Sequence, residues 1–143
     1  MNALLIDAGN SRIKWATVVA GRLRAAQALD WSPHTLSRVA RLIAACAPAA
    51  MIETVLVSSV AGPAVASALR QAMRAAGAPA PRFVRSPRSA AGVINGYRAP
   101  QRLGVDRWLG LVAARDRYPA SPVCVVGIGT AMTVDLLDRH GRH

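Results

Sequence analysis

The sequence predicts an α/β fold in which helices cover a mixed sheet. Short β-branched and aliphatic segments alternate along the chain with segments of helical period. Two apolar strand pairs, one near each end of the sequence, are joined by tight turns that contain glycine. Hydrophobic residues make up 52% of the 143 residues, enough for a substantial core, and no apolar run is as long as a membrane span. This alternation of strands and helices is typical of a layered α/β domain.

The first thirty residues predict three strands. Residues 3–8 and 12–19 are apolar segments separated by Gly9 and Asn10, a dipeptide typical of an antiparallel hairpin. Residues 22–29 follow another glycine and predict a third strand.

Two helices then alternate with two further strands. Ser32 and Pro33 predict a helix start, with the serine hydroxyl as cap and proline at the first helical position. Apolar residues then recur at helical spacing: Leu36, Val39, Ala40, Ile43 and Ala44. Residues 54–60 predict a β-branched strand, residues 63–76 a second helix, and residues 81–86 an edge strand.

The last third of the chain predicts a loop, a helix and a strand pair. Residues 87–102 carry proline, glycine, asparagine and arginine without periodicity and predict a loop. A third helix is expected from about residue 103 to 118. Residues 120–143 then repeat the opening pattern of strand, glycine turn and strand. With no helix left to cover this pair, we expect it to expose apolar surface as the beginning of a second domain.

The strongly basic charge indicates attraction to anions such as nucleic acid, phosphates or carboxylate metabolites. Eighteen basic residues against seven acidic ones give a formal net charge of +11, and Lys14 is the only lysine. The arginines are scattered and the few aromatic residues are not interleaved with them, as a stacking surface for bases would require. This spread favours arginines on solvated faces and argues against a nucleic-acid partner.

The cysteines and the N-terminus predict a cytoplasmic protein with no membrane partner. Cys46 and Cys124 lie in apolar surroundings without metal-ligand spacing, which predicts buried, reduced thiols rather than a disulfide or a nucleophile. Asp7 interrupts the first apolar run, so the start does not have the pattern of a signal peptide.

The stretch around Asp7 is the first candidate site. Gly9 allows backbone N–H groups to approach a phosphate closely, and Asn10 and Ser11 add side-chain donors. A carboxylate beside phosphates requires a cation between them, so Asp7 predicts Mg²⁺, held through water, while Lys14 supplies a mobile positive charge. The alternative is a plain hairpin with an Asx-type turn.

A second glycine turn and a helix start carry further candidates. Residues 127–133, "GIGTAMT", again present glycines and hydroxyls at a strand end. A helix beginning near Gly104 places Asp106 at its first turn, where the carboxylate could accept a proton from an alcohol while Arg107 stabilises negative charge. The alternative is that Asp106 complements the helix dipole and Arg107 is solvated.

Three motifs, in this order and spacing, resemble the type III pantothenate kinases: "DAGNSRIKW", "NGYRAPQRLGVDRW" and "GTAMTVDLL". The resemblance spans the whole chain and implies ATP-dependent phosphorylation of pantothenate, the first committed step towards coenzyme A. It also implies a ribonuclease H-like or actin-like kinase domain over residues 1–119, with a mixed sheet and flanking helices. Residues 120–143 would be the first hairpin of a second, similar domain.

The resemblance assigns roles to particular residues of this chain. It implies that ATP binds to Asp7, Ala8, Gly9, Asn10, Ser11, Arg12, Ile13, Lys14 and Thr130. It implies that pantothenate binds to Tyr97, Gly104, Val105, Asp106 and Arg107, with Asp106 taking the proton from the primary hydroxyl. It further implies a homodimer, although the apolar face of Trp108, Leu109 and Val112 is more simply explained as domain core.

Two departures limit what the resemblance implies. Members of the family often carry an acidic residue that binds K⁺ or NH₄⁺ where this chain has Gly127, which leaves only backbone carbonyls as ligands. The sequence also stops soon after the second domain begins, so the segment alone is expected to be inactive.

Two alternative functions remain open from the residues. One is a related kinase of the same superfamily that acts on another small alcohol or carboxylate; Tyr97 and the stretch from Gly104 to Arg107 argue against it. The other is a regulatory or nucleic-acid-associated protein that keeps the fold without turnover, against which the intact Asp106 argues.

Overall fold

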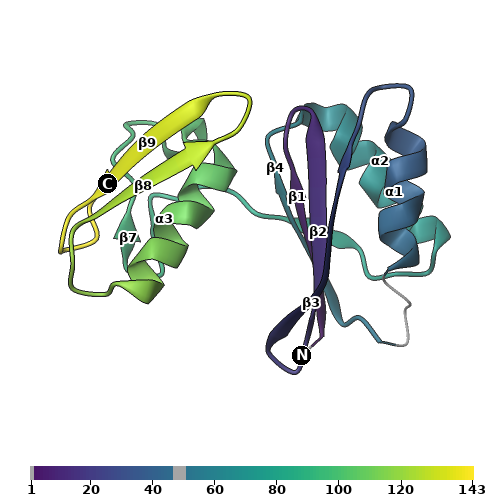
Figure 1. Cartoon of the computed structure of the whole chain (residues 1–143), viewed down its shortest axis with the longest axis horizontal. Helices are drawn as coiled ribbons and strands as arrows, with labels where there is room; N and C mark the ends of the chain where they lie inside the picture. Colours follow the sequence, from purple (N-terminus) through teal and green to yellow (C-terminus); the bar gives the residue numbers. More distant parts are fainter. Residues whose placement is uncertain (1, 47–50) are drawn as a thin grey trace. The chain divides into compact units, whose positions relative to one another are not determined.

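The computed structural model describes residues 2–46 and 51–143, which form two compact units (Figure 1). The first unit extends to Val84 and the second runs from Arg85 to His143. This division lies well before residue 119, where the sequence analysis puts the end of the first domain. A second domain that begins at residue 120 stays a prediction.

The first unit is built on a five-stranded mixed sheet in the order β3-β2-β1-β4-β5 (Figure 1). Its strands are β1 (Ala3–Ala8), β2 (Arg12–Val19), β3 (Arg22–Asp30), β4 (Thr54–Ser59) and β5 (Pro81–Phe83). β1 and β2 form the predicted antiparallel hairpin, while β4 and β5 run parallel to β1. β5 is the predicted edge strand, three residues long. The α/β class with a mixed sheet is therefore confirmed.

Helices α1 (Leu36–Ala45) and α2 (Gly62–Ala75) pack together and enclose the core of the first unit. The amphipathic pattern of α1 is confirmed, because its five periodic apolar residues are all buried. They pack against alternate residues of the central strands, including Leu4, Ile6, Val55 and Val57. Burial of this apolar surface is the main stabilising contribution to such a unit.

The start of α1 differs from the prediction. The helix begins at Leu36 rather than at Pro33, and residues 33–35 form a turn. The Ser32 carbonyl accepts hydrogen bonds from the N–H groups of Thr35 and Leu36, and the Ser32 N–H donates to the Thr35 hydroxyl. This local turn satisfies the polar groups that a capped helix start would otherwise use.

The second unit contains structure in the segment that the sequence predicts to be a loop. Residues 87–102 hold β6 (Ser89–Ala90), β7 (Val93–Ile94) and the single 3₁₀ turn η1 (Pro100–Arg102). The end of the chain lies beside β7: the Ile94 N–H donates to the Gly141 carbonyl at 2.7 Å, and the His143 N–H donates to the Ile94 carbonyl at 3.0 Å. Two-residue strands are too short to produce a readable alternation, which is why the pattern missed them.

Helix α3 (Val105–Arg117) packs on the antiparallel hairpin of β8 (Val123–Ile128) and β9 (Met132–Leu137). Its buried residues Trp108 and Leu111 form a second small core with Val93, Leu103 and Leu137. The expectation that no helix covers this strand pair is therefore wrong for one face of the hairpin. The interpretation of the Trp108 face of the helix as core is confirmed.

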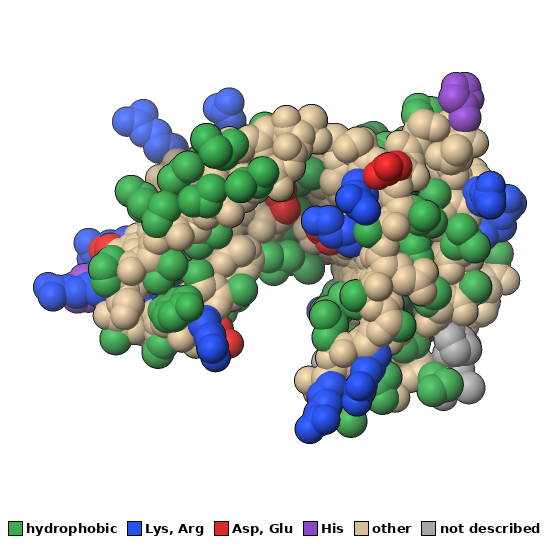
Figure 2. Space-filling view, viewed as in Figure 1, with side chains coloured by type: hydrophobic (Ala, Val, Ile, Leu, Met, Phe, Trp, Pro, Cys, Tyr) green, Lys and Arg blue, Asp and Glu red, His purple; other side chains and the backbone are tan. Residues whose placement is uncertain are grey.

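The opposite face of the β8–β9 hairpin is apolar and exposed, as expected for this strand pair. Figure 2 shows the hydrophobic side chains over this hairpin. Three cross-strand pairs form this outward face: Cys124 with Leu136, Val126 with Val134, and Ile128 with Met132.

The prediction that both cysteines are buried is wrong, because Cys124 occupies an outward position of β8 and Cys46 is half-buried at the end of α1. Both thiols are free.

Within the described residues, none of the helices is both long enough and apolar enough to cross a membrane.

Candidate functional site

The first glycine turn joins β1 to β2 and presents the predicted phosphate-binding residues. The Gly9 N–H donates to the Arg12 carbonyl at 2.9 Å, which closes the turn, and a Cβ at Gly9 would lie only 3.1 Å from that oxygen. Asp7 and Lys14 face one another across the strand pair, with carboxylate and ammonium 3.9 Å apart and both half-exposed. Such a loose pair leaves both charges accessible to a ligand.

Trp31 binds two carbonyl groups of this turn. Its indole N–H donates to the Gly9 carbonyl at 2.9 Å, and its backbone N–H donates to the Ser11 carbonyl at 2.9 Å. In the part of the chain that the structure describes, the backbone N–H groups of Asn10 and Ser11 have no hydrogen-bond partner. The turn therefore offers N–H donors while the carbonyls of Gly9, Ser11 and Arg12 are engaged, which suits an anion.

Ser58 lies beside Asp7 and was not identified from the sequence. It sits opposite Asp7 in the register of parallel strands β1 and β4 and is 7% exposed. Its hydroxyl is buried without a hydrogen-bond partner among the described residues. The "TVLVSS" pattern predicts a strand, and only the register with β1 brings this hydroxyl next to the carboxylate.

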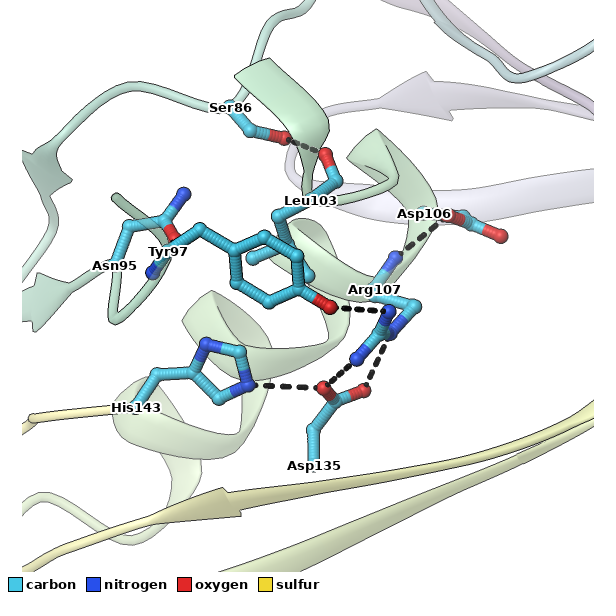
Figure 3. A network of polar contacts seen from close by, with 8 residues as sticks. All are labelled: Ser86, Asn95, Tyr97, Leu103, Asp106, Arg107, Asp135 and His143. Carbon is cyan, nitrogen blue, oxygen red and sulfur yellow. Dashed lines mark hydrogen bonds and ion pairs between the residues drawn. The ribbon is translucent and has the colours of Figure 1, made fainter. Parts of the chain in front are cut away.

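The N-terminus of α3 positions Asp106 in the second unit. Gly104 is the residue before the helix, Val105 is its first residue, and Asp106 lies in the first turn, as predicted. The Asp106 carboxylate is exposed and accepts the backbone N–H of Arg107 at 2.9 Å (Figure 3). A Cβ at Gly104 would lie 2.6 Å from this carboxylate oxygen, so glycine there leaves room for the acid to fold against the helix end.

Arg107 points the other way, into a network of polar side chains (Figure 3). Its Nε donates to Asp135 at 3.0 Å, its Nη2 donates to the other oxygen of the same carboxylate, and its Nη1 donates to the Tyr97 hydroxyl at 3.2 Å. The alternative in which Arg107 is merely solvated is therefore wrong. His143 Nε2 lies 2.9 Å from Asp135, and the His143 ring stacks on Tyr97 with ring centroids 5.9 Å apart.

The charges in this network stabilise each other. The hydrogen bonds from Arg107 lower the pKa of the Asp135 carboxyl, against the opposing effect of burial. The same pairing raises the pKa of the Arg107 guanidinium further above its already high value. Asp135 is therefore an ionised carboxylate at neutral pH, although only 2% of it is exposed.

A rigid loop holds Tyr97 over this network. The buried Asn95 accepts the Tyr97 N–H at 3.0 Å through its side-chain oxygen and donates from its amide nitrogen to the carbonyls of Pro87 and Pro100. Arg88 donates to the Tyr97 carbonyl at 2.9 Å. The loop between Pro87 and Pro100 is therefore tied together by side chains, since strands supply few of its hydrogen bonds.

The second glycine turn joins β8 to β9 in the second unit. Thr130 is exposed in this turn, and Gly127 faces Thr133 across the hairpin. A Cβ at Gly127 would lie 2.7 Å from the Thr133 hydroxyl oxygen, so a side chain there would displace Thr133.

The sequence-predicted residues fall into separate groups. The turn from Asp7 to Lys14 belongs to the first unit, whereas Tyr97 and Arg107 meet in the second unit with Asp106 next to them. Asp135 and His143 complete the second group but were missed. A signal for Asp135 was present, since an acidic residue at an inward position of an apolar strand is costly unless it is paired.

The sequence model of the family described as "Type III pantothenate kinase" matches residues 3–143. This chain belongs to that family.

Curated relatives with the name type III pantothenate kinase come from several bacteria. That of Nitrosococcus oceani is 39% identical over 144 residues, covering 98% of this chain and 53% of the relative. That of Halorhodospira halophila is 42% identical over 148 residues, covering 98% of this chain and 56% of the relative. The chain thus spans about half the length of the curated type III pantothenate kinases that it matches.

Among solved structures, an Aquifex aeolicus PPX-GPPA enzyme is similar with a TM-score of 0.49 and 13% identity. The match covers 98% of this chain and 49% of that one. This likeness is too weak to identify the fold.

Proposed function

We propose that the protein containing this chain phosphorylates pantothenate with ATP to give 4'-phosphopantothenate, the first step of coenzyme A biosynthesis. The observation that carries the proposal is the family match over residues 3–143. Because the chain spans about half of its curated relatives, the activity is proposed for the whole protein.

The first glycine turn is proposed to bind the ATP phosphates through residues Asp7, Ala8, Gly9, Asn10, Ser11, Arg12, Ile13 and Lys14. The Asn10 and Ser11 N–H groups, for which residues 2–46 and 51–143 supply no acceptor, and the exposed Lys14 ammonium support this role. Thr130 is proposed to contact ATP from the second glycine turn.

Mg²⁺ fits this turn as part of a complex with ATP. The described residues contain no cluster of three or more His, Cys, Asp or Glu side chains that could hold a metal by themselves. Mg²⁺ characteristically keeps several waters and takes its remaining ligands from one or two carboxylates and the substrate phosphates. Asp7 would hold it through water, and the bound ion would neutralise charge on the phosphates.

In the proposed mechanism, Asp106 accepts the proton of the primary hydroxyl as that oxygen attacks the γ-phosphorus atom, and the bond from this phosphorus to the β,γ-bridging oxygen breaks to release ADP. The exposed position of Asp106 in the first turn of α3 supports this role, because the carboxylate is accessible to a substrate. Arg107 and Tyr97 are proposed to bind pantothenate and stabilise negative charge, with Gly104 and Val105 forming the adjacent backbone. Phosphoryl transfer depends mainly on such positioning and electrostatics.

A K⁺ or NH₄⁺ site at Gly127 does not fit the side chains present. Gly127 supplies no carboxylate, and Thr133 occupies the space beside it. Only backbone carbonyls and the Thr133 hydroxyl could serve as ligands there, so we expect turnover without a K⁺ requirement.

The family membership also supports a ribonuclease H-like or actin-like kinase fold, a second domain that begins at residue 120, a homodimer, and a cytoplasmic location. These features belong to the same proposal.

The decisive experiment measures 4'-phosphopantothenate directly, for example by mass spectrometry. The protein at the length of its relatives is assayed beside the 143-residue chain, with and without K⁺. We expect ATP-dependent product from the long protein only, unchanged by K⁺. A long protein that binds ATP and leaves pantothenate unmodified would contradict the proposal. Activation by K⁺ would contradict the interpretation that the position of Gly127 forms no K⁺ site.

A further inference from the structure

Asp135 lies at the centre of the network beside the proposed pantothenate site, and neither the sequence analysis nor the proposed reaction gives it a role (Figure 3). It projects from an inward position of β9 and is almost completely buried. A buried carboxylate is costly unless it is paired and hydrogen-bonded. Its partners therefore indicate what it does.

Asp135 binds Arg107 through both oxygens. The contact is bidentate: it uses the guanidinium Nε and Nη2 and so fixes both the position and the plane of the guanidinium. His143 Nε2 reaches the same carboxylate, and the His143 ring stacks on Tyr97. The contacts close a ring from Arg107 through Asp135, His143 and Tyr97 back to Arg107.

This pairing determines which Arg107 donors remain. A guanidinium has five N–H groups. Asp135 takes two of them and Tyr97 takes one, so one N–H on each terminal nitrogen stays available. Because the guanidinium is planar and its plane is fixed, these two N–H groups have set directions.

The pairing also orients the Tyr97 hydroxyl. A guanidinium donates hydrogen bonds and accepts none, so the Tyr97 oxygen must be the acceptor of its contact with Arg107. The hydroxyl hydrogen is therefore directed elsewhere. Among the described residues no acceptor for it is found.

We propose that Asp135 is a positioning residue that holds Arg107 so that two guanidinium N–H groups and the Tyr97 hydroxyl are presented to an oxygen-bearing group of pantothenate. This inference rests on the proposed function. Because the Arg107–Asp135 pair has no net charge, it acts as an oriented set of donors and recognises its ligand by geometry rather than by long-range attraction.

The test is a double-mutant cycle in the protein at the length of its relatives, using Asp135→Asn, Arg107→Ala and the double variant. Asp135→Asn is expected to lower kcat/KM for pantothenate by about 10- to 100-fold and to leave the KM for ATP within about twofold. The size of this loss is taken from the analogous case in which a residue that orients a metal ligand is removed. In the Arg107→Ala background, Asp135→Asn should cause no further decrease in kcat/KM for pantothenate, because Asp135 acts through Arg107. Asp116→Asn makes the same chemical change at an exposed position of α3 and is the matched control.

Two outcomes would overturn the proposal. One is an equal loss from Asp135→Asn with and without Arg107, which would make the two residues independent. The other is a parallel rise in the KM values for ATP and pantothenate, which would indicate a general structural role.

A second measurement does not depend on activity or on the folding of Asp135→Asn. In the ¹⁵N NMR spectrum of the unsubstituted protein, the Arg107 Nε–H signal, assigned by its loss in Arg107→Lys, should exchange with water much more slowly than the other arginine signals. Exchange as fast as theirs would overturn the fixed orientation. If this signal is protected but pantothenate is not phosphorylated, the proposed function fails while the positioning by Asp135 stands.

Discussion

Gly96 packs directly against the carbonyl group of His143, so closely that a Cβ at residue 96 would overlap the oxygen. The same backbone contact carries the hydrogen bond from the His143 N–H to the Ile94 carbonyl. Gly96 immediately precedes Tyr97, so this close approach brings the Tyr97 and His143 rings into their stack. Glycine is required here for space rather than for an unusual backbone angle.

Gly96→Ala should therefore destabilise the second unit by about 1–3 kcal/mol, the usual cost of forcing extra atoms into a packed region. Urea unfolding followed by far-UV circular dichroism measures it. The matched control is Gly110→Ala in the middle of α3, where a Cβ would meet Val125 at an ordinary 3.5 Å. Alanine is favoured over glycine in a helix, so this variant should gain up to about 1 kcal/mol. Equal losses in the two variants would contradict the role of the Gly96 contact.

Acid should remove the stabilisation from Asp135. The pKa of Asp135 is lowered in the folded protein from an ordinary value of 3.8, mainly by its hydrogen bonds with Arg107. The folded state then binds this proton less readily than the unfolded state, so the stabilisation is fully present above about pH 4 and disappears as the pH falls through the lower folded pKa.

Urea unfolding between pH 6 and pH 2.5 tests this dependence. Asp135→Asn should show a flatter fall in the free energy of unfolding over the acidic range than the unsubstituted protein. Asp138 must be compared separately, because backbone N–H groups also lower the pKa of its carboxyl. If Asp135→Asn leaves the slope of the unfolding free energy against pH unchanged and Asp138→Asn makes it flatter, the acid sensitivity belongs to Asp138.

Asp106→Asn should reduce turnover by about 10²- to 10⁴-fold, the usual contribution of a positioned general base. The amide can still accept the Arg107 N–H, so binding of ATP and pantothenate and the stability of the fold should change little. Isothermal titration and steady-state kinetics on the same preparation separate these effects. A loss of pantothenate binding as large as the loss of turnover would make Asp106 a substrate anchor instead.

Asp7→Asn should weaken the use of Mg-ATP, because the amide keeps the shape of the side chain and loses its charge. Titration of the rate with Mg²⁺ at fixed ATP should show a higher requirement for the ion. Asp116→Asn, which makes the same chemical change at an exposed position of α3 outside both proposed sites, is a suitable control. An unchanged Mg²⁺ dependence in Asp7→Asn would remove this carboxylate from the neighbourhood of the ion.

The sequence predicted the elements that have a strong local signal. The β1–β2 hairpin and the buried face of α1 follow from period and turn chemistry, and both are confirmed. The start of α1 was wrong because a turn of Ser32 and Thr35 competes with the helix for the same polar groups. The strands β6 and β7 were missed because they are only two residues long.

The candidate site was predictable only where its residues are close in sequence. Gly104, Asp106 and Arg107 occupy one helix start, so their arrangement follows from local structure. The partners of Arg107 are distant in sequence. Asp135 lies 28 residues further along the chain, and Tyr97 belongs to the loop before α3. Such contacts depend on how α3 packs on β9, which the pattern of a single segment does not contain.

The Arg107–Asp135 pair has a consequence for how the hairpin folds. The outward residues of β9 are all apolar: Met132, Val134 and Leu136. A shift of β9 by one residue would turn these side chains inward in place of Thr133, Asp135 and Leu137, at little hydrophobic cost. The shift would, however, turn Asp135 out into water and leave the guanidinium of Arg107 without its carboxylate. The buried charge thus selects one alignment of the two strands from alternatives that hydrophobicity alone would not separate.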